Sequence, residues 1–198
     1  MISAFTPDKS ASRLLTQKAI YFRRMERYYT QSLGLPIVTE SGQKIARVID
    51  VVLNTDTGKI VGFLTSPSGQ KVVAPIDILH WGNALVVQDE ESILDSDEIH
   101  AVSDAFKKGT HVFRNRVVTK SGENLGQVID YAINDKMFVM TKIVVAKTIF
   151  GLITYDRRII AHKDILEIKK DLIKVKDPLR LDPIKATTKL RVDSVPGV

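Results

Sequence analysis

The chain has 198 residues, of which 44% are hydrophobic and 26% are charged, and its formal net charge at pH 7 is +6. This is the balance of an ordinary globular protein, so a globally disordered chain is excluded. Because there is no cysteine, disulfides, thiolate metal sites and cysteine nucleophiles are excluded as well. No apolar stretch approaches the roughly 18 residues that span a bilayer, and residues 1–7 lack the pattern of a signal peptide. We therefore expect a cytoplasmic protein.

A basic amphipathic helix is predicted over residues 1–32. Thr6-Pro7-Asp8 has the pattern of a helix start, because Thr can cap the helix and Pro fits its first position. Apolar residues then recur at helical spacing with Lys and Arg among them. Three roles are open for this helix: packing on the protein, dimerisation, or binding an anionic membrane through residues 6–30.

A β pattern begins at residue 33 and continues to residue 91. Ile45–Asn54 is rich in β-branched residues and predicts a long strand, Thr55–Gly58 predicts a turn, and Lys59–Leu64 predicts the returning strand. Short strands that are separated by Gly and Pro without intervening helices indicate a small antiparallel barrel or sandwich.

A helical linker is predicted over residues 92–110. Ser96 is the expected cap, Val102 and Phe106 have helical spacing, and Gly109 is expected to end the helix.

The β pattern returns over residues 111–177. When the chain is shifted by 80 residues, eight of twenty positions are identical between residues 35–54 and 115–134, where background usage would give roughly one or two. Further along the chain the shift is 87 residues, so the second copy has about seven additional residues, around Lys147–Tyr155. The chain therefore contains an internal duplication, and residues 178–198 follow it as a tail.

The repeated residues resemble the PRC-barrel family. The resemblance rests on Val118-Thr119-x-Ser121-Gly122 followed by Val128-x-Asp130, on the matching first copy from Val38 to Asp50, and on the segment Pro75–Ile78. Ala46 and His162 depart from the family pattern, which has glycine and proline there. The resemblance implies two tandem small antiparallel β-barrels, each with its own apolar interior. It also implies adaptor modules without enzymatic activity, as in a ribosome maturation factor, a membrane-anchored reaction-centre subunit and sporulation-associated proteins.

Several repeated residues are expected to have structural roles. Carboxylates that recur in both copies could form an acid–base pair or a metal site, but they are more typical of acceptors for backbone N–H groups at strand ends and turns. The four histidines have no metal-ligand spacing, and no phosphate-binding loop or nucleophile elbow occurs. We expect no catalytic residue, metal or cofactor. The residues predicted to be structural are Gly42, Asp50, Asp77, Gly122, Asp130 and Asp164.

Three features could bind a partner. Trp81 is predicted at a hairpin tip, either as an exposed anchor or folded over a barrel mouth. The insertion is either an interaction loop or an extended hairpin. Residues 101–198 carry a net charge of +8, against −6 over residues 31–100, so the second copy could contact RNA or an acidic protein, or its charges could simply be solvated. The candidate binding residues are Trp81, Phe150, Leu152, Arg157, Arg158, Lys169 and Lys170.

The sequence thus predicts a non-enzymatic adaptor that binds a macromolecule, in the first place a protein. An RNA- or ribosome-associated maturation factor is one alternative, and a peripheral membrane protein that uses the N-terminal helix is another.

Overall fold

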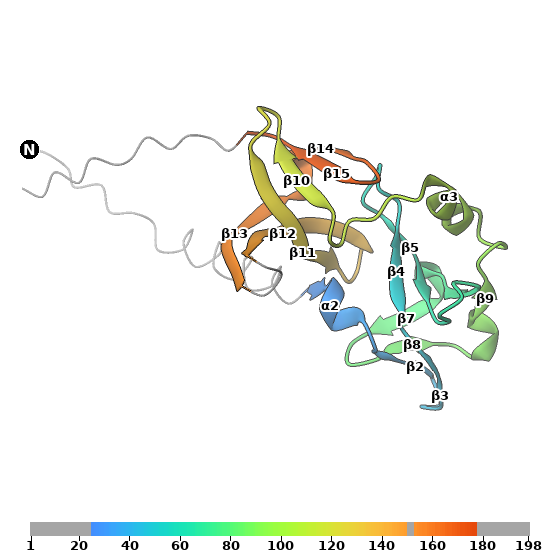
Figure 1. The fold of residues 1–198 in the computed structure, drawn as a ribbon. Helices are drawn as coiled ribbons and strands as arrows, with labels where there is room; N and C mark the ends of the chain where they lie inside the picture. The colour runs from blue at the N-terminus through green and yellow to red at the C-terminus, as the bar shows by residue number, and fades with distance from the viewer. Residues whose placement is uncertain (1–24, 150–152, 178–198) are drawn as a thin grey trace, which may run out of the picture.

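The computed structural model describes residues 25–149 and 153–177, and strands are its predominant element (Figure 1). The prediction of a mainly β protein is confirmed. The predicted N-terminal helix lies outside the described residues except for residues 25–32. In that part Glu26–Tyr28 form the strand β1, and Tyr29–Ser32 form a single helical turn, α2.

The first repeat forms two four-stranded sheets, in the orders β3-β2-β8-β7 and β4-β5-β6-β9. Its strands are short, and 3-10 turns at Pro75–Asp77 (η1) and Glu90–Ser92 (η2) precede β7 and β9. The strands are β2 (Pro36–Thr39), β3 (Lys44–Arg47), β4 (Asp50–Leu53), β5 (Ile60–Leu64), β6 (Lys71–Val73), β7 (Ile78–Trp81), β8 (Leu85–Val87) and β9 (Leu94–Asp95).

The second repeat forms one sheet in the order β13-β12-β11-β10-β15-β14, to which β1 is added along β11. A 3-10 turn, η3 (His162–Asp164), lies between β13 and β14. The strands are β10 (Arg116–Thr119), β11 (Asn124–Asn134), β12 (Val139–Ile149), β13 (Ile153–Ala161), β14 (Ile165–Ile168) and β15 (Leu172–Val175).

The two repeats share their strand order, but neither closes into a hydrogen-bonded barrel. In both, the first strand pairs in parallel with the second strand of the hairpin that follows the 3-10 turn, as β2 with β8 and β10 with β15. The expectation of closed barrels is wrong, because the sheets are open. In the second repeat η3 separates β13 from β14, and these strands remain the two edges. In the first repeat the chain breaks its ladder at residues 48–49, so the strand that corresponds to β11 is divided into β3 and β4.

The repeated Val-Thr-x-Ser-Gly sequence forms the turn after the first strand of each repeat. In the first repeat the Gly42 N–H donates to the Thr39 carbonyl at 2.9 Å, and the Gln43 N–H donates to Thr39 Oγ1 at 3.2 Å. Gly122 and Thr119 repeat this arrangement, with 3.0 Å for the corresponding backbone bond. Both glycines have positive φ, 86° and 93°, so the turn favours glycine at these positions.

The two repeats are related by a pseudo-two-fold axis at their junction. Lys59 of the first repeat forms an antiparallel bridge with Val139 of the second. At the shift of 80 residues these two positions correspond to each other. The Ile60 N–H donates to the Phe138 carbonyl, and the Met140 N–H donates to the Gly58 carbonyl, both at 2.8 Å. Exchanging the two repeats converts one bond into the other, which is the signature of a self-complementary interface.

The main hydrophobic core runs through this interface rather than being divided into two separate interiors. One cluster of buried side chains contains Phe63 and Trp81 from the first repeat and Tyr131, Met140 and others from the second. Aromatic rings meet across the junction: Trp81 is stacked on Phe138 with 5.7 Å between ring centroids and is edge-on to Phe63 at 5.0 Å. The prediction of an independent apolar interior for each repeat is therefore wrong.

The predicted linker contains the helix α3 (His100–Lys108), which is shorter than expected. Gly109 ends it in a left-handed conformation, as predicted, but the N-cap is Ile99 and not Ser96. Leu94–Asp95 are taken up as β9 by pairing with β6, which delays the start of the helix. Val102 of α3 is fully buried against Val52 and Val72 in a second, small core. Within the described residues no helix is long and apolar enough to cross a membrane.

Candidate functional site

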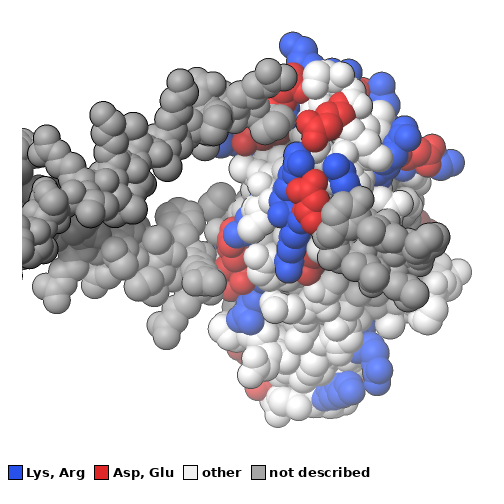
Figure 2. All heavy atoms as spheres, turned by 60° about the vertical axis from the view of Figure 1, so that its left-hand side comes forward, with Lys and Arg blue, Asp and Glu red and all other residues white. Residues whose placement is uncertain are grey.

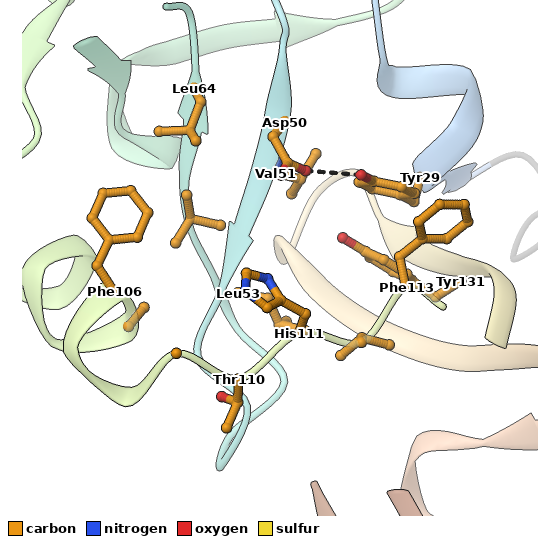
Figure 3. Close-up of a pocket in the computed structure, with 14 residues that line it drawn as sticks. Tyr29, Asp50, Val51, Leu53, Leu64, Phe106, Thr110, His111, Phe113 and Tyr131 are labelled. Atoms are coloured by element: carbon orange, nitrogen blue, oxygen red, sulfur yellow. Dashed lines mark hydrogen bonds between the residues drawn. The ribbon is translucent and has the colours of Figure 1, made fainter. Parts of the chain in front are cut away.

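A pocket of about 320 Å³ lies between the repeats (Figure 3). Its volume is at the lower end of the range of about 300–1,000 Å³ that is usual for ligand sites. In Figure 3 the ring of Phe106 lies on one side and the rings of Tyr29, Phe113 and Tyr131 on the other, with β4 between them. The lining is contributed by α2, β4, the end of β5, α3, the segment Gly109–Phe113, and β11.

Asp50 and Asp130 hold the segment that enters the first repeat. Each carboxylate accepts the N–H of the residue that follows it, Val51 at 2.7 Å and Tyr131 at 2.8 Å. Asp50 Oδ1 also accepts the Tyr29 hydroxyl at 2.9 Å. Asp130 accepts both the backbone N–H and the hydroxyl of Thr30, at 3.2 and 2.6 Å. The two carboxylates therefore bind donors of β1–α2 and of their own strands.

The remaining residues predicted to be structural lie at turns. Asp77 and Asp164 close the 3-10 turns η1 and η3, which are equivalent in the two repeats. The Asp164 carboxylate also accepts a hydrogen bond from Lys176 Nζ at 3.2 Å.

Aromatic rings form one wall of the pocket. Tyr29 is stacked on Tyr131 with 4.7 Å between ring centroids, and its ring lies 5.0 Å from that of Phe113. Burial raises the pKa of the Tyr29 phenol well above its usual value of 10.0, and the neighbouring Asp50 carboxylate raises it further. Burial likewise raises the pKa of Tyr131. Both phenols are therefore protonated at neutral pH, and Tyr29 can donate to Asp50.

These two phenols make the stability of the protein depend on pH at the alkaline side. A phenol whose pKa is higher in the folded chain stabilises the fold fully below pH about 10, and this contribution is lost as the pH rises from there toward the folded pKa. We expect the free energy of unfolding to fall above pH 10 by about 1.4 kcal/mol per pH unit for each such phenol. In Tyr29→Phe the slope should be shallower.

Urea unfolding followed by circular dichroism between pH 8 and pH 11 measures this slope. At pH 8 both phenols are protonated, so the difference between the proteins is the lost hydrogen bond to Asp50. Parallel curves for the two proteins above pH 10 would contradict the assignment to Tyr29.

The pocket borders a sheet edge that is open in the first repeat and filled in the second. β4 pairs with β5 only and is the edge strand of its sheet. The equivalent edge of β11 pairs with β1, and Arg27 is opposite Ile133. The pocket thus combines an unpaired strand edge, an aromatic wall and an exposed apolar ring, since Phe106 is 44% exposed. Such a combination is suited to binding a ligand or a peptide segment.

In the described part of the chain, no group of three or more His, Asp or Glu side chains is placed to hold a metal ion.

Trp81 was predicted either as an exposed anchor or as a side chain folded over a barrel mouth, and the structure shows it buried. Its side chain is only 4% exposed, because the β7–β8 hairpin directs it into the aromatic cluster with Phe63 and Phe138. Trp81 is therefore buried and is not the exposed anchor that was one of the two predicted arrangements. Phe150 and Leu152 lie outside the described residues. On either side of them the backbone of the insertion continues β12 and β13 as one hairpin.

The basic candidates lie on two different elements and are partly paired with carboxylates. Arg158 contacts Asp156 at 2.9 Å and Glu123 at 3.4 Å, and lines a groove of about 450 Å³ with the exposed Ile159. Arg157 is exposed on the same strand, whereas Lys169 and Lys170 lie at the β14–β15 turn, where Lys169 is 3.1 Å from Glu167. On the face in Figure 2 basic and acidic side chains are intermingled.

Sequence reasoning missed most residues of the pocket. From the sequence, Phe106 and residues 109–110 are predicted to lie in the linker, and residues 111–113 at the start of the second β pattern. The only available signal was the shift of 80 residues extended backwards, which aligns Thr30 with Thr110 and β1 with the end of α3.

The family model of the PRC-barrel domain matches residues 25–100. The match covers the first repeat, together with β1 and α2 before it. It does not extend to the second repeat, which is related to the first by the internal identities and by the shared strand order. No curated protein matches the chain significantly.

Proposed function

We propose that this chain, with its PRC-barrel domain over residues 25–100, is a non-enzymatic adaptor that binds a partner protein at the pocket between its repeats. The observation that carries the proposal is the open edge of β4 beside this pocket. Strand edges without a partner strand are sites at which proteins can add a strand from another chain. The use of PRC-barrel domains as adaptor modules supports the same function.

The charge distribution supports a protein partner over RNA. Binding to a phosphate backbone needs several unpaired basic side chains on one surface. Arg158 and Lys169 are instead close to carboxylates, and the pocket itself contains Asp50. A ribosomal or other RNA partner is therefore the second outcome of the test below.

The test uses Phe106→Glu in the full chain. Because Phe106 is 44% exposed and lines the pocket, a charge there should block binding at little cost in stability. The matched control is Leu79→Glu, which changes a leucine that is 54% exposed on β7, outside this pocket. The immobilised proteins are incubated with a lysate of the cells that produce the chain, with and without ribonuclease.

We expect the wild type and Leu79→Glu to retain the same protein, and Phe106→Glu to retain it at least about tenfold less, because an apolar contact is replaced by a buried charge. Ribonuclease should have no effect. Equal retention by all three proteins would remove the pocket from the function, and release by ribonuclease would favour the RNA-associated alternative.

A further inference from the structure

The pseudo-two-fold axis relates the unpaired edge of β4 to the edge of β11 in the second repeat. That edge of β11 is paired with β1. On β11, β1 pairs antiparallel with residues 132–134, and the Asp135 N–H donates to the Met25 carbonyl at 2.8 Å. The positions that face β1 are therefore Ile133 and Asp135. At the shift of 80 their counterparts in the first repeat are Leu53 and Thr55. These counterparts lie at the edge of the sheet where β4 has no partner strand.

The segment that would fill this edge by symmetry is folded elsewhere. The counterparts of Glu26–Tyr28 are residues 106–108, which form the last turn of α3. Val102 anchors α3 on the outer face of β4 and β5, so these residues cannot extend along the edge. Thr110, the counterpart of Thr30, is displaced as well: its hydroxyl bonds to Thr55 Oγ1 at 2.8 Å rather than to Asp50. The pocket lies beside Asp50, Val51 and Leu53 of this edge.

Asp50 lies at the end of this edge, and its two carboxylate oxygens are used differently from those of Asp130. Both oxygens of Asp130 accept hydrogen bonds from Thr30. At Asp50 the Tyr29 hydroxyl and the Val51 N–H both bind Oδ1. Among the described residues no donor is bound to Asp50 Oδ2, and Asp50 lines the pocket.

We propose that the β4 edge binds an extended segment of the partner protein, antiparallel to β4 and in the register of β1 on β11. A serine or threonine in this segment takes the place of Thr30 and donates its hydroxyl to Asp50. This inference rests on the proposed function and specifies the chemistry of the partner. Residues 31–100 carry a net charge of −6, so a neutral or basic segment is favoured over an acidic one.

The probe is a peptide with the chain's own sequence from residue 25 to residue 32, acetylated and amidated at its ends. In the register of β1, the N–H of its Arg27 faces the strand and the N–H of its Tyr28 points away from it. N-methylation at Arg27 therefore removes a ladder hydrogen bond, whereas N-methylation at Tyr28 is the matched control. A third peptide carries Thr30→Val, which removes the hydroxyl and keeps the shape.

Each peptide is titrated into the full-length, ¹⁵N-labelled protein. We expect saturable shifts of the Leu53 and Thr55 amide signals with the unmodified peptide. N-methylation at Arg27 and Thr30→Val should each weaken binding by at least about tenfold, because each leaves a polar group unpaired. The peptide methylated at Tyr28 should bind as the unmodified one does. The signal of Ile133, which is already paired, should not move.

Three results would overturn the inference: no saturable shift at Leu53, equal binding of both methylated peptides, or shifts at Ile133 that report displacement of β1. If the peptides fail while Phe106→Glu still abolishes capture of the partner, the proposed function stands and the partner is not an added strand. If both experiments fail, the function falls as well.

Discussion

Replacing Trp81 with alanine should lower the free energy of unfolding by about 3–5 kcal/mol, the usual cost of removing a large buried aromatic side chain. Trp81 is fully enclosed by Phe63 from its own repeat and Phe138 from the other. Its loss therefore leaves a cavity at the junction that joins the repeats. In a chain of this size the melting temperature should fall by roughly 6–20 °C.

Thermal and urea unfolding followed by circular dichroism measure this effect. The control is Leu79→Ala, two residues earlier on the same strand, where the side chain is 54% exposed. That substitution should change stability by no more than about 0.5 kcal/mol. A Trp81→Ala protein as stable as this control would show that the aromatic cluster does not hold the repeats together.

Replacing Gly126 with alanine should cost roughly 2–5 kcal/mol, because the strain of an unfavourable backbone conformation and the cost of a steric clash add together. Gly126 has a φ of 105°. A Cβ atom there would lie 2.1 Å from the Ala146 carbonyl oxygen, which is backbone and cannot rotate away. The β11–β12 ladder would have to shift.

The first repeat supplies the control for Gly126. Its counterpart is Ala46, and β5 ends at Leu64, the counterpart of Val144, so no strand continues past this position as β12 does. Ala46→Gly should therefore change stability by only about 0.5–1 kcal/mol. If Gly126→Ala unfolds at the same urea concentration as the wild type, the close approach of β11 and β12 is not a constraint.

Features that depend on neighbouring residues could be predicted from the sequence. The Val-Thr-x-Ser-Gly turns and the end of α3 at Gly109 are fixed by contacts within a few residues of one another. The duplication is visible as residue identities at a shift of 80. The sequence also showed that Ala46 stands where the family pattern has glycine, but it did not show why alanine is tolerated there. Glycine is required only where the longer hairpin passes over the strand, and that is a contact between strands.

Features that depend on the second repeat could not be predicted. Glu26–Tyr28 lie within a pattern of helical spacing, yet they form β1 because residues more than 100 positions later offer an unpaired edge. Trp81 is predicted at a hairpin tip of its own repeat, yet it is buried against Phe138 of the other repeat as well as Phe63 of its own. The pocket arises from the same cause, since its walls come from both repeats.

The pairing of β1 with β11 has a consequence for the way the chain is made. Ribosomes add about 5–20 residues per second, so Phe138 is synthesised roughly 3–12 s after Trp81. Until then the rings of Phe63 and Trp81 lack the cover of Phe138, and the residues of β1 have no strand to join. The β1 strand and the aromatic junction can therefore form only after the second repeat is made, and until then their apolar side chains lack this cover.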